Sequence, residues 1–190
     1  MPFVNYYSDQ CMDSVRGEGD EPLSVLPAVA GKAILIFAIG NESRGDDALA
    51  PLLVRGLEGS AETAGRVELI EDYQLQVEHV TDLLERSAVL FVDADVSCIE
   101  PFHFSEISAA HDNSYTSHAM SPFALLHTYS QVYGADAPPA FLLRIRGYDF
   151  ELGSPLSGRA AANLEAAMAQ MHLLCADGDL QRWRQRLAVT

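Results

Sequence analysis

The chain has 190 residues, of which 48% are hydrophobic, and its 27 acidic residues against 12 basic ones give a formal net charge of -15. This length and apolar content suit one ordinary globular domain. A charge of this sign repels nucleic-acid phosphates and anionic membrane surfaces, so we expect neither as a partner. Three scattered cysteines suggest neither a disulfide framework nor a thiolate zinc site, and the first thirty residues lack the apolar core of a signal peptide. We therefore expect a cytoplasmic protein.

Apolar patterning predicts alternating strands and helices from residue 33 onward. Residues 1–32 mix Gly, Pro and acid without a helix or strand period, which predicts an irregular N-terminal arm followed by a single domain over residues 33–190. The run Ala33–Ile39 is continuously apolar, as in a strand buried on both faces of a parallel sheet. The predicted elements that follow are helix 47–58, strand 67–71, helix 77–86, strand 88–92, a short edge strand 102–104, helix 122–132, strand 140–145 and a long helix 158–175.

This alternation predicts an α/β fold in three layers: a mostly parallel, twisted sheet of about five strands, with helices on both faces. In such sheets, ligands bind in the crevice beyond the carboxyl ends of the strands. Polar residues that directly follow an apolar strand are therefore the first candidates for a functional site.

Two segments place acids at that edge. The segment GNESRGDD directly follows the first strand and carries Asn41, Arg44, Asp46 and Asp47, while Asp93 directly follows the apolar run AVLFV. If these strands are neighbours, their carboxylates converge, and like-charge repulsion is costly unless a cation or a shared proton relieves it. The pattern therefore favours a metal site.

A third candidate ligand is His118, in a loop that ends where Ser121 can cap a helix and Pro122 can take its first position. Two carboxylates and one imidazole suit nickel or zinc better than magnesium or calcium, which prefer oxygen ligands only. Other interpretations stay open. Asp46 and Asp47 suit the first turn of a helix equally well, and His118 is one histidine among six.

The segment AIGNESRGDDALAP resembles the opening motif of the NiFe hydrogenase maturation endopeptidases, an apolar strand followed by a Gly-Asn turn and an acidic pair. VELIEDYQLQVEHVTDLLERSAVLFVDADVS, SHAMSPFALL and GYDFELGSPLS resemble later segments of the same family, so the resemblance covers about residues 33–175. It implies a phosphorylase/hydrolase-like three-layer fold.

The resemblance also implies a function. Family members cut one peptide bond and so release the C-terminal extension of a hydrogenase large-subunit precursor that already carries nickel. By position, Asp47, Asp93 and His118 are the implied metal ligands, and Asp47 or Asp46 is the implied catalytic base. The implied metal is nickel presented by the precursor, with no organic cofactor, and we expect the protein to work as a monomer.

The sequence departs from the family pattern at three places. Asp47 stands where Glu is frequent, Ala50 stands where Gly is usual, and EDYQLQ over residues 71–76 replaces an Asp-Gly-Gly-Thr segment. The last feature, with SRGDD, resembles the subgroup that serves soluble NAD-reducing bidirectional hydrogenases.

Two functions other than a protease are compatible with parts of this pattern. A nucleotide-binding or oxidoreductase domain is disfavoured, because GNESRGD has no Gly-x-Gly-x-x-Gly run and its acids repel a pyrophosphate. A non-catalytic nickel carrier or scaffold for hydrogenase assembly would keep the three ligands and lose turnover.

Overall fold

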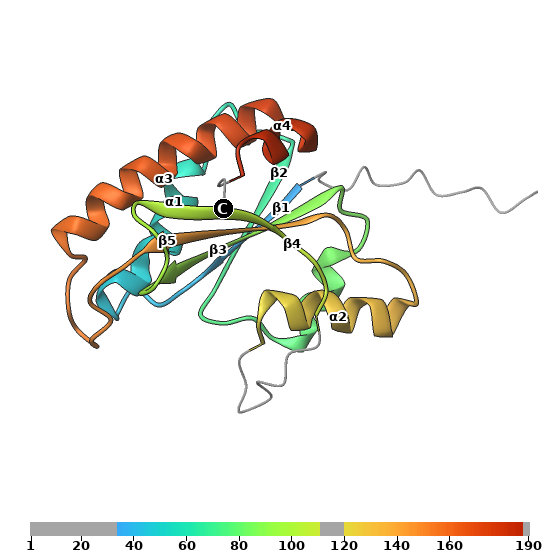
Figure 1. Cartoon of the computed structure of the whole chain (residues 1–190), viewed down its shortest axis with the longest axis horizontal. Coiled ribbons are helices and arrows are strands. Elements are labelled where there is room, and N and C mark those ends of the chain that lie inside the picture. Colours follow the sequence, from blue (N-terminus) through green and yellow to red (C-terminus); the bar gives the residue numbers. More distant parts are fainter. Residues whose placement is uncertain (1–33, 111–119, 188–190) are drawn as a thin grey trace, which may run out of the picture.

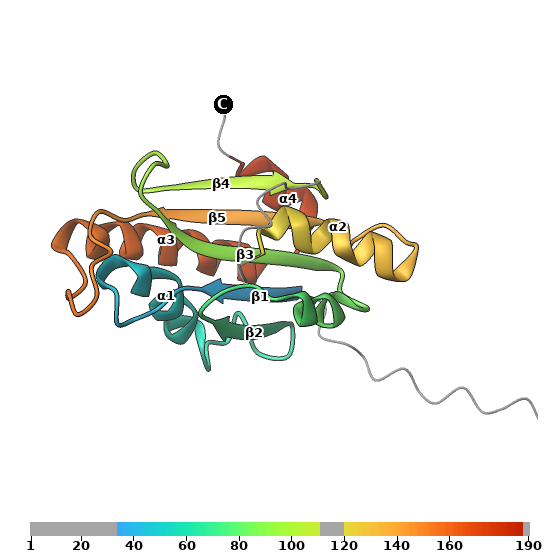
Figure 2. The same ribbon diagram turned by 90° about the horizontal axis from the view of Figure 1, so that it is seen from below.

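A computed structural model of the protein describes residues 34–110 and 120–187. The expectations about residues 1–32 and His118 therefore lie outside the described residues. The sheet has five strands in the order β2-β1-β3-β5-β4, as Figure 2 shows. Neighbouring strands are parallel except for β4, which runs antiparallel to β5. The strands are β1 (Ile34–Ile39), β2 (Val67–Asp72), β3 (Ala88–Asp95), β4 (Phe102–Ile107) and β5 (Ala140–Arg146). The predicted α/β fold is thus confirmed.

Helices cover both faces of this sheet and create two apolar cores. On one face lie α1 (Leu49–Leu57), α3 (Gly158–Asp177) and α4 (Leu180–Gln185), and on the other lie α2 (Pro122–Tyr133) and the 3-10 helix η2 (Val77–Leu83). In Figure 1, α3 and α4 lie above the sheet and α2 below it. Successive residues of β1 enter opposite cores, which explains why its sequence is apolar without alternation.

The order of the strands creates a switch point between β1 and β3. After β1 the chain turns through α1 toward β2 at one edge, whereas after β3 it turns toward β4 at the other edge. The two connections diverge, which leaves a crevice outside the carboxyl ends of this strand pair. Of the acids predicted as site residues, Asp46 and Asp47 follow β1, and Asp93 lies in the last part of β3.

Several elements differ from the sequence prediction. The predicted helix over residues 77–86 is the shorter 3-10 helix η2, and β3 runs past the predicted end at residue 92 to Asp95, so that Asp93 lies within the strand. The edge strand β4 extends to Ile107, beyond the predicted end at residue 104. Polar residues interrupt its sequence because not every residue of an edge strand faces a core, so the sequence pattern did not show the full length of the strand. The helix α4 was not predicted, since six residues are too few to show a helical period. It is held by Trp183, whose Nε1 donates to the Leu174 carbonyl oxygen (2.9 Å) and whose ring packs against Phe141.

Two further features concern the cysteines and the apolar character of the helices. Cys98 and Cys175 are buried free thiols, in agreement with the expectation that these cysteines form no disulfide framework. Within residues 34–110 and 120–187, no helix combines the length and the apolar character needed to cross a membrane.

Candidate functional site

The loop after β1 turns Asp47 back onto the end of that strand. Gly40 is required there, because a Cβ atom at this position would lie 2.1 Å from the backbone oxygen of Asp47. The 3-10 helix η1 (Gly45–Ala48) then presents the Asp47 carboxylate, and its Oδ2 accepts a hydrogen bond from the Asn41 N–H (3.0 Å). The predicted helix over residues 47–58 thus begins as this tighter turn and continues as α1.

Asp93 lies beside this loop on the neighbouring strand. It pairs in register with Ile39, the last residue of β1, and its Oδ1 accepts a hydrogen bond from the Ala94 N–H (2.8 Å). Burial raises the pKa of Asp93, the Ala94 hydrogen bond opposes this change, and the negative charges of Asp47 and Asp95 add to it, so that the pKa reaches about 7. The structure therefore brings Asp47 and Asp93 together at the switch point.

The carboxyl group of Asp47 is also perturbed. Burial raises its pKa, although the Asn41 hydrogen bond and the positive charge of Arg44 oppose the change. Each of the two carboxylates uses one oxygen for a described backbone hydrogen bond, Oδ2 in Asp47 and Oδ1 in Asp93. Two close carboxylates that resist joint ionisation are suited to a shared proton or a divalent cation.

Asp46 has a different environment from its neighbour Asp47. Its side chain is fully buried, and its two oxygens accept hydrogen bonds from the backbone of Tyr148, Asp149 and Ser157 and from the Ser157 hydroxyl, at 2.7–3.1 Å. Burial alone would raise its pKa, but these hydrogen bonds outweigh it and lower the pKa. The geometry favours a structural role for Asp46, which fixes the loop between β5 and α3 to the loop after β1.

We expect Asp46→Asn to lower the free energy of unfolding by about 3 kcal/mol. The amide group of Asn cannot accept all four hydrogen bonds, and its NH2 group would face N–H or O–H groups that are themselves donors. The loss should appear in urea unfolding near pH 7. Since the folded pKa is depressed, the carboxylate stabilises the protein above pH ~4 and loses this effect as the pH falls through the folded pKa. A variant as stable as the parent but unable to cleave substrate would show instead that Asp46 acts in catalysis.

The chain near His118 is anchored at the same crevice. Met120 donates its N–H to the Leu75 carbonyl oxygen (3.0 Å), and Ser121 caps α2 by accepting from the Ala124 N–H (3.2 Å). Leu75 adjoins Gln74, which lines a cleft with Asp47. Met120, two positions after His118, is thus bonded to the residue that follows a lining residue of the Asp47-side cleft. Among the residues that the structure describes, no group of three His, Cys, Asp or Glu residues is placed to hold a metal ion. The third predicted ligand, His118, lies outside those residues.

Two clefts flank the carboxylate pair and share Phe150. The Asp47-side cleft, of about 320 Å³, is polar, whereas the Asp93-side cleft, of about 260 Å³, has mainly apolar walls. The Asp47-side cleft is lined by Asn41, Arg44, Asp47, Tyr73, Gln74 and Phe150. The Asp93-side cleft is lined by Asp93, Ala94, Asp95, Val96, Pro122, Leu142, Arg144 and Phe150.

Sequence reasoning did not assign a role to Phe150 or Arg144. Phe150 belongs to the recognised segment GYDFELGSPLS, but its place between the clefts depends on the way Asp46 holds that loop. Arg144 had a weak signal, because it is the first charged residue after the apolar run AFLL of β5. A charge within a mostly apolar central strand indicates a side chain that reaches a polar site, here the lining of the Asp93-side cleft.

Comparison with known proteins adds the decisive observation. The structure is similar to the NiFe hydrogenase maturation protease HycI from Thermococcus kodakarensis KOD1, with a TM-score of 0.58 and 20% identity over 76% of this chain and 92% of that chain. The chain has the hydrogenase maturation protease fold. It is also similar to the hydrogenase maturating endopeptidase HybD from E. coli, with a TM-score of 0.57 and 21% identity over 76% of this chain and 93% of that one. No protein-family model and no curated protein sequence matches the chain.

The hydrogenase maturation protease fold agrees with the resemblance seen in AIGNESRGDDALAP. At about 20% identity, this agreement concerns the fold. The assignment to the subgroup that serves NAD-reducing hydrogenases stays a prediction, as do the roles of Asp47, Asp93 and His118. In this fold the described part of the chain brings two of the three predicted ligands together at the switch point.

Proposed function

We propose that the protein is an endopeptidase that removes the C-terminal extension of a nickel-loaded hydrogenase large-subunit precursor. One observation carries the proposal: Asp47 and Asp93 converge at the switch point of a hydrogenase maturation protease fold, with a cleft on either side. Two clefts that share Phe150 and each contain one of the carboxylates suit a peptide that lies across the pair. The acids between them suit a cation carried by that peptide.

In this proposal, nickel is part of the substrate. Asp47, Asp93 and His118 complete the coordination of the nickel that the precursor presents, so that only a loaded precursor is held in place for cleavage. The nickel would polarise the carbonyl group of the cleaved bond or lower the pKa of a bound water. The protein then acts as a checkpoint as well as a protease.

The catalytic base in this mechanism is Asp47, and Asp46 is a positioning residue. Asp47 lines an open cleft, whereas Asp46 is fully buried and spends both oxygens on the protein's own backbone and Ser157. Asp47 takes a proton from water as the water oxygen bonds to the carbonyl carbon. The proton then passes to the leaving nitrogen as the carbon–nitrogen bond breaks, which yields a new carboxyl terminus and a free tail.

Intact-mass spectrometry of a purified nickel-loaded precursor tests this function. We expect incubation with the protein to release one discrete C-terminal peptide and to shorten the precursor by the same mass. The alternative, a non-catalytic nickel carrier or scaffold, predicts a complex with an unchanged precursor mass. Absence of both cleavage and binding would contradict the protease and the carrier together.

The remaining features of the proposal follow from composition. A formal charge of -15 argues against nucleic acid and anionic membranes as partners, and we propose that the protein acts as a monomer in the cytoplasm. A nucleotide-binding role gains no support from the site, because the carboxylates of Asp47, Asp93 and Asp95 in the cleft linings would repel a phosphate group.

A further inference from the structure

The Asp93-side cleft has an amphipathic lining that the proposed mechanism does not use. Ala94, Val96, Pro122, Leu142 and Phe150 give it apolar walls, and charged side chains lie at one end. Val96 is 60% exposed although it is β-branched and apolar, and it stands at this cleft instead of in a core. An apolar surface of this kind next to reactive groups is typical of a subsite for part of a substrate.

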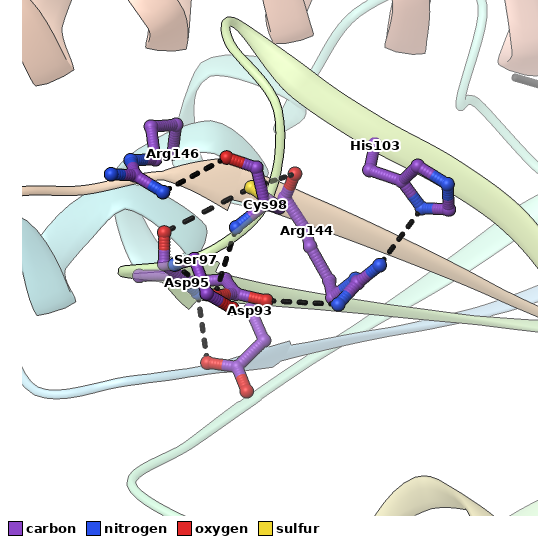
Figure 3. A network of polar contacts seen from close by, with 8 residues as sticks. Asp93, Asp95, Ser97, Cys98, His103, Arg144 and Arg146 are labelled. Carbon is purple, nitrogen blue, oxygen red and sulfur yellow. Dashed lines mark hydrogen bonds and ion pairs between the residues drawn. The ribbon is translucent and has the colours of Figure 1, made fainter.

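At the charged end of the cleft, Arg144 contacts side chains of the two neighbouring strands. On the sheet, Arg144 lies between Asp93 and His103 in one cross-strand row. Its Nη1 donates to Asp95 Oδ2 (3.0 Å), and its Nη2 lies 3.1 Å from His103 Nδ1, as Figure 3 shows. The buried Nε has no partner among the described atoms. The described hydrogen bonds of the two Nη atoms thus go to Asp95 and His103 and not to the Asp93 carboxylate.

The cleft adjoins the place where a substrate would be cut. Asp93 belongs both to this cleft and to the carboxylate pair, and Phe150 separates the cleft from the Asp47-side cleft. A peptide in extended form that crosses the pair would place neighbouring side chains in opposite clefts, since successive side chains point to opposite sides. Of the two clefts, the Asp93-side one has the apolar walls.

We propose that the Asp93-side cleft is a specificity subsite that binds one aliphatic side chain of the substrate peptide, from a residue adjoining the cleaved bond. This inference rests on the proposed endopeptidase function and adds a substrate preference to it. Burial of the aliphatic side chain against Val96, Leu142 and Phe150 would contribute to binding. An acidic side chain in its place would be repelled by Asp93 and Asp95.

A pair of valine substitutions tests the subsite. Val96→Asp puts a charge at the mouth of the cleft, and we expect kcat/KM for a nickel-loaded precursor to fall at least about 10-fold, mainly through KM. Val132→Asp is the matched control, because Val132 is 58% exposed and lies on α2 outside the residues that line the cleft. We expect it to leave kcat/KM unchanged. Equal kcat/KM for Val96→Asp and the parent, with both proteins folded by circular dichroism, would overturn the subsite.

A charge exchange identifies the occupant. Each of the two precursor residues that adjoin the cleaved bond is replaced in turn by Asp, and both precursors are offered to the parent and to Val96→Lys. We expect the parent to cut one of them poorly and Val96→Lys to restore at least part of that loss. Lack of rescue at both positions would overturn the proposal. If the parent fails to cut even the unmodified nickel-loaded precursor, the proposed function itself has failed, so the two failures are distinguishable.

Discussion

Asp47→Asn should reduce the rate of precursor cleavage by about 10³-fold and leave the fold intact. The amide cannot take a proton from water, but its oxygen can still accept the hydrogen bond from the Asn41 N–H that Asp47 Oδ2 accepts now. Since burial raises the pKa of Asp47, removal of the charge should not lower the free energy of unfolding. Single-turnover cleavage followed by intact mass, together with urea unfolding, measures both quantities.

The matched control for this variant is Asp136→Asn, which changes an exposed aspartate in the loop before β5. We expect it to cut at the parental rate. Comparison with Asp46→Asn then separates catalysis from positioning, because that variant should lose stability first and Asp47→Asn should lose activity alone. Cleavage by Asp47→Asn within a few-fold of the parental rate would remove Asp47 from the role of base.

Asp93→Asn should stabilise the protein at neutral and alkaline pH while it abolishes cleavage. The folded pKa of Asp93 is about 7, so the folded protein retains a proton that the unfolded chain has already released above its ordinary pKa of 3.8. As the pH rises from about 4 to 7, this difference favours the unfolded state, and it reaches its full size above pH ~7. The uncharged amide removes the penalty and still accepts the hydrogen bond from the Ala94 N–H.

We therefore expect Asp93→Asn to raise the free energy of unfolding by on the order of 2 kcal/mol at pH 8 and to leave it unchanged near pH 4. The difference between the two proteins, obtained from urea unfolding at several pH values, isolates this one group, because the other acids contribute equally to both. A difference that does not vary with pH would mean that Asp93 is ionised in the folded protein at low pH, as in an isolated aspartate.

The sequence predicts the centre of this fold better than its edges. β1 and β3 are buried on both faces, so their apolar runs are unmistakable, and the residues that follow them are then located by the topology of parallel sheets. The edge strand β4 and the short helix α4 depend on tertiary contacts, such as the packing of Trp183 on Phe141, that leave little pattern in the sequence.

Some residues of the candidate site can be predicted from the sequence, and others cannot. Asp47 and Asp93 are predictable because Asp47 lies in the loop after the buried strand β1, and Asp93 is the first polar residue after the fully buried run of β3. The contrast between Asp46 and Asp47 is not, since it depends on hydrogen bonds from residues about one hundred positions away in the β5–α3 loop. The same long-range contacts place Phe150 between the clefts, and Arg144 meets Asp95 and His103 only when three strands align.

The central claim is that the carboxylate pair makes cleavage conditional on the metal of the substrate. The most direct test offers the protein equal concentrations of nickel-loaded and nickel-free precursor and follows both by intact mass. The account predicts release of the C-terminal peptide from the loaded precursor alone, with no release from either when Asp47→Asn replaces the parent. Equal cleavage of the two precursors by the parent would contradict it, because Asp47 and Asp93 would then have no role in reading the metal.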